Sequence, residues 1–210
     1  MIAAPAHSPA QDAIIDALLR RVPMQGWTGS ALRGALTDVG ADPEDADLLF
    51  PGGAAELIEA FIDLTDRHMA EAAAADPAFA ALRTTARVRA LLVLRLEQNR
   101  PHRDAIRRAL AVLARPRHAA VAARCLARSV DAIWHAAGDR AADFSWYTRR
   151  VTLAAVWSAT LLFWLRDGSE DDAATLAFLD RRLAGVGRIG ALRRRAGQAC
   201  ERLHPQRAAA

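Results

Sequence analysis

The segment from Asp143 to Asp167 reads DFSWYTRRVTLAAVWSATLLFWLRD and predicts one long helix. Asp143 can cap its N-terminus, and no glycine or proline follows before Arg166. One stripe of the helix repeats at steps of three and four residues and carries Trp146, Arg150, Leu153, Trp157, Leu161 and Trp164. From Val151 to Leu165 the other faces are apolar as well, which is typical of a helix inside a bundle, under a partner subunit or in a bilayer. We therefore expect a central helix.

This apolar segment is too short to cross a membrane. As a helix, residues 151–165 would span about 22 Å, whereas the hydrocarbon core of a bilayer is about 30 Å thick. The first nineteen residues contain no arginine and no long apolar run, so we expect neither a signal peptide nor a transit peptide. Cys125 and Cys200 lie far apart without metal or redox spacing, which indicates free thiols in a reducing compartment.

The rest of the chain predicts further helices and no strand. Alanine is abundant, whereas β-branched and aromatic residues are sparse, and this composition favours helices. We expect Pro23, Pro77, Pro101 and Pro116 to separate consecutive helices. The predicted helices are Gln11 to Val22, Thr28 or Ser30 to Val39, a short one from Pro43, Ala54 to Ala75, Ala78 to Asn99, His102 to Ala114, Pro116 to the region of Gly138, the long helix, and one opening at Asp171 or Asp172.

Three short helices followed by a larger helical body resemble the arrangement of the TetR-type regulators. We therefore predict an all-α, TetR-like helical bundle. Residues 11–53 would form a degenerate helix-turn-helix unit, residues 54–185 a body for ligand binding and dimerisation, and residues 186–210 a basic C-terminal tail.

The charge distribution argues against DNA binding by the first unit. The chain has 28 basic residues, all arginine, but none of them lies between Gly34 and Asp66, where there are nine acidic residues. In a helix-turn-helix unit the third helix enters the major groove, and its flanks contact phosphates. Acidic residues at that place repel the phosphate backbone, so we expect no nucleic-acid partner. A solvated acidic face explains the same residues equally well.

A sharper resemblance rests on the long helix itself. The run DFSWYTRRVTLAAVWSATLLFWLRD is similar to the signature of the coenzyme Q (ubiquinone) biosynthesis accessory proteins, a lipid-binding family with a TetR-like fold. The likeness continues in SVDAIWHAAGD (Ser129 to Asp139), TLAFLDRRL (Thr175 to Leu183), GWT (Gly26 to Thr28) and FPGGAAELI (Phe50 to Ile58). The segment from about Ala78 to Ala119 matches only in general character.

The resemblance implies an apolar tunnel for an isoprenoid lipid and the presentation of polyprenyl quinone precursors to the demethoxyubiquinone hydroxylase. It also implies a homodimer that packs through the last helices of the body. A C-terminal amphipathic helix would contact the membrane, although this chain ends soon after His204-Pro205 and has Leu176 where relatives often carry Trp. The expected location is the cytoplasmic face of a bacterial inner membrane.

The candidate partner-binding residues are Trp134, His135, Asp143, Trp146, Tyr147 and Arg150. Part of this set follows from the resemblance, which places the docking patch around Trp134, Asp143, Trp146 and Tyr147. The residue types also suit an interface, because Trp, Tyr and Arg dominate binding hot spots. The alternative is that one of the two aromatics of the first turn anchors the helix to the core.

Apolar side chains on several helices are candidates for lipid binding, because burial of a polyprenyl tail gains ~0.8 kcal/mol per methylene-sized group. They are Leu91, Leu94, Val130, Ile133, Val156, Trp157 and Leu161. Each of them can instead simply fill the core. The basic tail offers the candidate membrane-contact residues Ile189, Leu192, Arg193, Arg194 and Arg195, and a solvated tail is the alternative.

No motif for catalysis or metal binding stands out. There is no Ser-His-Asp set, Cys-His pair or carboxylate pair, and the histidines lack metal-ligand spacing. Residues 185–190 match G-x-G-x-x-G, but a predicted helix precedes them where a dinucleotide site needs a strand. We therefore expect a non-catalytic protein without a metal or other cofactor beyond a bound isoprenoid quinone or other lipid. The alternatives are a TetR-type ligand-responsive transcriptional regulator and an interaction scaffold without a ligand.

Overall fold

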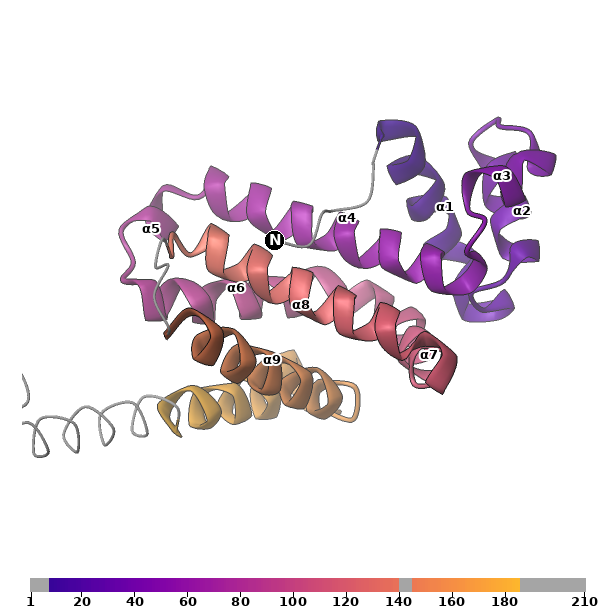
Figure 1. The fold of residues 1–210 in the computed structure, drawn as a ribbon. Coiled ribbons are helices and arrows are strands. Elements are labelled where there is room, and N and C mark those ends of the chain that lie inside the picture. Colours follow the sequence, from indigo (N-terminus) through magenta and orange to yellow (C-terminus); the bar gives the residue numbers. More distant parts are fainter. Residues whose placement is uncertain (1–7, 140–144, 186–210) are drawn as a thin grey trace, which may run out of the picture. The chain divides into compact units, whose positions relative to one another are not determined.

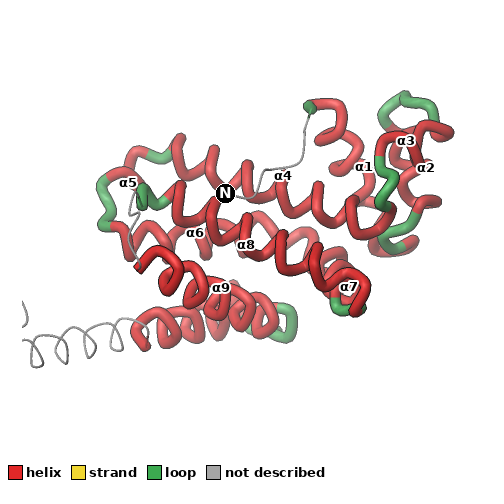
Figure 2. The backbone as a smooth tube through the Cα atoms, in the orientation of Figure 1, coloured by secondary structure: helices red, strands yellow, loops and turns green. Residues whose placement is uncertain are grey.

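The computed structural model describes residues 8–139 and 145–185, and these residues are helical without any strand (Figure 2). The predicted all-α class is therefore confirmed. The chain divides into two compact units, one ending at Ala154 and one beginning at Ala155, which we describe separately. None of the helices in the described ranges combines the length and the apolarity that a membrane span requires.

The N-terminal helices are α1 (Pro9–Gln25), α2 (Gly29–Asp38), the 3-10 turn η1 (Pro43–Asp45) and α3 (Ala46–Leu49) (Figure 1). The end of α2 follows from its sequence: Gly40 has φ 76, and the N–H groups of Gly40 and Ala41 donate to the carbonyls of Thr37 and Leu36. This is the Schellman arrangement, in which glycine takes the left-handed conformation without strain.

The prediction that Pro23 ends the first helix is wrong. The helix α1 continues through Pro23 to Gln25 and is closed by Gly26, whose N–H donates to the carbonyl of Val22. Proline removes one backbone donor and crowds one carbonyl of the preceding turn. Only two helical residues follow Pro23, so little of the helix depends on the lost bond.

Gly26, Trp27 and Thr28 connect α1 to α2. Gly26 has φ 69, and the Thr28 hydroxyl caps α2 by accepting from the N–H of Ala31. Trp27 is buried, its indole N–H donates to the carbonyl of Ala105 at 3.0 Å, and its ring lies 5.5 Å from that of Phe61. The three residues of the GWT motif therefore end one helix, anchor the chain and begin the next helix.

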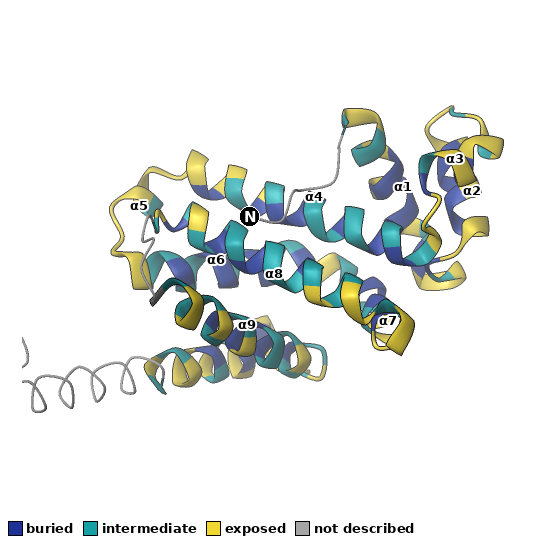
Figure 3. Ribbon diagram, viewed as in Figure 1, coloured by how far each residue is buried: buried dark blue, intermediate teal, exposed yellow. Residues whose placement is uncertain are grey.

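The following helices are α4 (Gly53–Ala75), α5 (Pro77–Ala80), α6 (Thr84–Asn99), α7 (Arg103–Leu113) and α8 (Ala119–Ala136), with the 3-10 turns η2 (Arg100–His102) and η3 (Pro116–His118) between them. The helices α4, α6 and α8 pack together, and their buried faces carry Leu57, Ile58, Leu64, Leu91, Leu92, Leu96 and Ile133 (Figure 3).

The predicted helix from Ala78 to Asn99 is wrong in its first part, because α5 and α6 are separate helices. Asp76 caps the short helix α5 by accepting from the N–H of Ala78. The Arg87 guanidinium donates a hydrogen bond to the backbone carbonyl of Ala80, the last residue of α5. A side-chain donor on the next helix thus satisfies a carbonyl at a helix end where no glycine or proline follows.

The long helix is α9 (Ser145–Trp164), and the chain itself covers only part of its apolar surface. Leu153, Val156, Trp157 and Trp164 are buried, whereas Val151 is 70% exposed and Leu162 is 58% exposed. The apolar pattern of the sequence indicates which side chains favour burial. It does not indicate whether the chain itself or another molecule covers them.

After α9, the chain turns through η4 (Glu170–Asp172) into a helix over residues 173–185. Asp167 holds this turn, because Thr175 donates to its carboxylate from both the backbone N–H and the hydroxyl. Burial by itself would raise the pKa of Asp167, but the hydrogen bonds from Thr175 and Ser169 outweigh it and hold the pKa well below its usual value. The rings of Phe163 and Phe178 stack at 4.6 Å.

We predict that Trp27→Phe lowers the free energy of unfolding by about 1–3 kcal/mol, because the buried carbonyl of Ala105 loses its donor and the smaller ring fills less space. Trp27→Ala should lower it further. Urea denaturation measures both effects. Met24→Leu is the control, since Met24 is 88% exposed and its replacement should change stability by less than about 0.5 kcal/mol. Equal stability of the parent and the Phe variant would contradict the anchoring role.

Candidate functional site

The end of α8 fixes the position of Asp139. Gly138 has φ 80, its N–H donates to the carbonyl of His135, and the N–H of Asp139 donates to the carbonyl of Trp134. These two bonds form a second Schellman arrangement, which requires glycine at position 138. The WHAAGD sequence thus ends the helix and places a carboxylate directly after it.

Arg149 of α9 meets this carboxylate. Its guanidinium nitrogen Nη1 donates to Oδ1 of Asp139 at 3.1 Å. The same guanidinium carbon lies 5.7 Å from the centre of the Trp134 ring, within the range of a cation–π contact. The Asp139 side chain is only 7% exposed, whereas that of Arg149 is 33% exposed, so the carboxylate is buried and the arginine is partly open to solvent.

Arg150 forms a second chain of contacts. Its Nε donates to Oδ1 of Asp131 on α8, and its guanidinium lies over the ring of Trp146 at 3.7 Å. The rings of Trp146 and Tyr147 meet edge to face, with their centres 4.7 Å apart and an angle of 75° between their planes. The carboxylate therefore orients the arginine, and the arginine covers one face of the first aromatic ring.

The outer end of this chain is Tyr147, which is 66% exposed, whereas Trp146 is half-buried. A large aromatic side chain held by its neighbours but open to solvent loses little further conformational freedom when a partner covers it. This geometry suits a protein–protein contact, in which Trp, Tyr and Arg carry most of the binding energy. We call Trp134, Trp146, Tyr147, Arg149 and Arg150 the aromatic–arginine cluster.

The structure thus brings together three of the predicted partner-binding residues directly, Trp146, Tyr147 and Arg150, and places Trp134 beside them through Arg149 and Asp139. His135 is exposed in the last turn of α8. Asp143 and the predicted membrane-contact residues Ile189, Leu192, Arg193, Arg194 and Arg195 lie outside the described residues.

Sequence reasoning missed two carboxylates of this arrangement: Asp131 and Asp139. Both carboxylates stand in the SVDAIWHAAGD motif, so a signal was present. Asp131 precedes Trp134 and His135 by three and four residues, which places it on the same face of α8. Asp139 follows a glycine that is suited to ending a helix.

The predicted lipid-binding residues lie in both compact units. In the first, Leu91, Val130 and Ile133 are buried and Leu94 is half-buried; in the second, Val156 and Trp157 are buried and Leu161 is half-buried. These exposures fit a lining role and a filling role equally, so the assignment stays a prediction.

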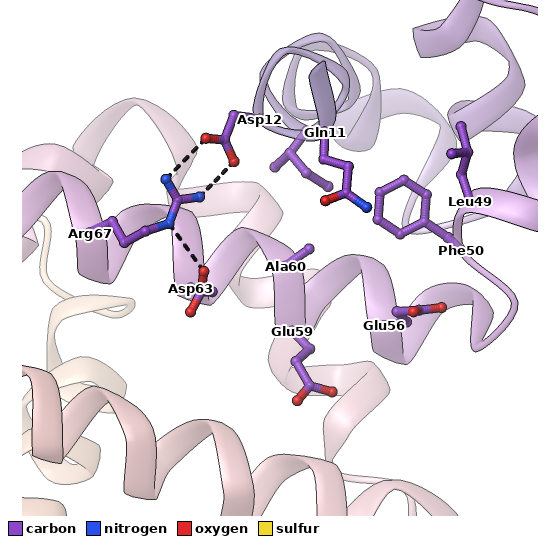
Figure 4. A pocket seen from close by; sticks show the side chains of 10 residues that line it. Gln11, Asp12, Leu49, Phe50, Glu56, Glu59, Ala60, Asp63 and Arg67 are labelled. Carbon is purple, nitrogen blue, oxygen red and sulfur yellow. Dashed lines mark hydrogen bonds and ion pairs between the residues drawn. The ribbon is translucent and has the colours of Figure 1, made fainter. Parts of the chain in front are cut away.

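A cavity of about 150 Å³ lies elsewhere, between α1, α3 and α4 (Figure 4). Its apolar wall comes from Ile15, Leu49, Phe50 and Ala60, and its polar wall from Gln11, Asp12, Glu56, Glu59, Asp63 and Arg67. In Figure 4, Arg67 points between Asp12 and Asp63 and forms ion pairs with both, at 2.6 and 3.1 Å. None of the predicted lipid-binding residues lines this cavity. Within the described ranges, no three His, Cys, Asp or Glu side chains are grouped to hold a metal.

The fold is that of the TetR class. The crystal structure of the TetR transcriptional regulator from Nitrosomonas europaea ATCC 19718 superimposes with a TM-score of 0.67 and 26% sequence identity, over 84% of this chain and 97% of that chain. This likeness confirms the predicted TetR-like bundle.

Within that class, residues 119–190 match the family model of COQ9, a range that includes α8 and α9 and with them the aromatic–arginine cluster. The mitochondrial ubiquinone biosynthesis protein COQ9 of Drosophila melanogaster is 34% identical over 182 residues, which cover 81% of this chain and 53% of that protein. Human mitochondrial COQ9 is 30% identical over 186 residues, covering 86% of this chain and 58% of that protein. The chain belongs to the COQ9 family, and it spans about half the length of these curated relatives.

We predict that Asp131 and Arg150 are energetically coupled. A double-mutant cycle with Asp131→Ala, Arg150→Ala and the double variant should give a coupling free energy of about 1 kcal/mol, because both side chains are partly buried. Thermal or urea unfolding measures it. The control cycle uses Asp104 and Arg108, an exposed pair on α7, and should give a smaller coupling. Additive single effects at Asp131 and Arg150 would show that the pair does not hold Trp146.

Proposed function

We propose that this protein acts in ubiquinone biosynthesis as a non-catalytic, lipid-binding accessory protein. It binds polyprenyl quinone precursors in its helical body and presents them to the demethoxyubiquinone hydroxylase. The aromatic–arginine cluster is the docking surface for that enzyme, and Tyr147 lies at its exposed end.

The observation that carries the proposal is the position of the cluster. It lies within the range that matches the COQ9 family model, and the relatives that match over most of this chain are named ubiquinone biosynthesis proteins. Two carboxylate–arginine pairs hold its rings, although the outermost ring makes no contribution to the core. Side chains fixed in this way at a solvent-facing surface are typical of a binding site rather than of a fold element.

We propose a homodimer that uses the uncovered face of α9. Val151 and Leu162 are large apolar side chains exposed on this helix, and a second copy of the chain would remove them from water. The protein would lie at the surface of a bacterial inner membrane, where its lipid is dissolved. The relatives above are mitochondrial proteins.

The alternative of a TetR-type transcriptional regulator has the named Nitrosomonas structure in its favour. The surface of this chain argues against it. Asp42, Glu44, Asp45 and Asp47 of η1 and α3 are all exposed where a DNA-binding unit of this kind needs basic side chains. We therefore favour the accessory role.

We predict that Tyr147→Ala and Trp146→Ala leave the fold intact and weaken binding to the purified hydroxylase. Loss of an interface hot spot costs about 2 kcal/mol, which is a roughly thirtyfold higher Kd. A pull-down followed by a titration measures the change. Leu48→Ala, which removes an exposed side chain of α3, is the control and should bind like the parent. Parent-like binding by both aromatic variants would refute the docking surface.

We also predict that the purified protein carries a prenyl lipid. Organic extraction followed by mass spectrometry should find an isoprenoid quinone or a precursor in the parent, because burial of each isoprene unit gains roughly 3–4 kcal/mol. A thermally unfolded and washed sample serves as the control for loosely adhering lipid. An extract without any isoprenoid species from protein purified without detergent would contradict lipid binding.

A further inference from the structure

A layer of polar side chains lies inside the packed helices α4, α6 and α8. Asp66 of α4, Arg95 of α6 and Ser129 of α8 are only 6%, 4% and 3% exposed. Nη2 of Arg95 lies 3.1 Å from Oδ1 of Asp66 and donates to the carbonyl of Ile62, and the Ser129 hydroxyl donates to Oδ2 of Asp66 at 2.6 Å. The apolar body that the sequence predicts is therefore interrupted by a charged group.

This group is incompletely satisfied by the described part of the chain. Nε and Nη1 of Arg95 have no acceptor there. Asn99 lies one turn further along α6, and its buried side-chain oxygen has no donor. A buried donor without an acceptor is costly, and a charged donor more so than a neutral one. These N–H groups, which point to different sides of the guanidinium, consequently need an oxygen from another molecule.

The charges indicate what kind of oxygen fits. Arg95 and Asp66 compensate each other, so a carboxylate or phosphate at this place would leave an excess negative charge in a buried site. Burial raises the pKa of Asp66 and lowers the pKa of Arg95, which shows that the interior disfavours both charges. A neutral acceptor, such as a ring carbonyl, a phenol or an ether oxygen, adds no charge.

The layer is flanked by predicted lipid-binding residues. Leu91 precedes Arg95 by one turn on α6, and Ile133 follows Ser129 by one turn on α8, so each lies on the same face of its helix as the polar residue. Both are buried. An amphipathic molecule with its tail along such apolar side chains would have its polar end within reach of the layer.

We propose that Arg95, oriented by Asp66, binds the neutral oxygen-bearing ring of the lipid that the helical body holds. The proposal rests on the lipid-binding function proposed above and names the recognition element for the head group. Selectivity then comes from the unsatisfied N–H groups of the guanidinium, while the tail contributes affinity without discrimination.

The test compares two probes with the same tail, decyl-substituted benzoquinone and decylbenzene, by calorimetric or fluorescence titration of the full chain. The parent should prefer the quinone by about tenfold or more, because only the quinone accepts a hydrogen bond from a buried charged donor. Arg95→Lys keeps the positive charge but has a single ammonium where arginine can donate to Asp66 from one nitrogen and to a ligand from another, and it should lose most of this preference. Asp66→Leu with Arg95→Met replaces the pair by apolar side chains and should bind both probes equally.

Arg124→Met is the matched control. Arg124 pairs with Glu59 on the same helical body but is 38% exposed, and its loss should leave the preference unchanged. A measurement on the parent alone covers the case in which a variant fails to fold: the infrared carbonyl band of bound quinone should lie at lower frequency than in a hydrocarbon solvent.

The outcomes separate the two proposals. Equal binding of both probes by the parent, or an unshifted carbonyl band, would leave lipid binding standing and overturn the role of Arg95, with water alone filling its donors. Retained preference in a folded Arg95→Lys variant would overturn it as well. Failure of the parent to bind either probe would overturn lipid binding itself.

Discussion

Charge compensation between helices is the constraint on which the packing of the larger unit depends. Two acidic residues of α4 pair with arginines of other helices: Glu59 with Arg124 and Arg128, and Asp66 with Arg95. Asp63 pairs with Arg67 of the same helix, which also binds Asp12 of α1. Hydrogen bonds from Arg124 lead the effects that lower the pKa of Glu59, so this carboxylate stays ionised in the fold. Two of the nine acidic residues between Gly34 and Asp66, namely Glu59 and Asp66, thus pair with arginines of α8 and α6. Removal of a single partner would leave the other charge in a partly buried site.

The aromatic–arginine cluster repeats this principle nearer the surface. Asp131 and Asp139 come from α8 and the turn after it, and they hold Arg150 and Arg149 of α9. The arginines in turn lie against Trp146 and Trp134. Because a guanidinium group is planar, it can donate hydrogen bonds to a carboxylate in its plane and stack its face on an aromatic ring. A chain with arginine in place of every lysine is suited to this double use.

Much of the fold could be predicted from local sequence, and the exceptions share a physical cause. Capping residues such as Thr28, Asp76 and the glycine at position 40 act on their own neighbours, so their effects are visible in the sequence. At the break between α5 and α6, Arg87 binds a carbonyl seven residues earlier in the chain. The exposure of one face of α9 is set by which other elements pack against the helix, and the helix sequence alone does not contain that information. In the site, aromatic residues stood out by type, whereas Asp131 and Asp139 gained their importance only from arginines ten and more residues later.

The N-terminal helices contact the rest of their unit through specific side chains. Arg67 of α4 makes a bidentate ion pair with Asp12 of α1, and the Trp27 indole donates to α7. Without α1 and Trp27, Phe61 would lose the ring beside it and Arg67 would lose its principal partner. These contacts show that the N-terminal helices cover part of the larger body, while exposed acidic residues lie on the outer surface of η1 and α3. In this chain the TetR-like fold explains how the helices pack. It does not determine the function, which depends on the side chains of the cluster on α8 and α9.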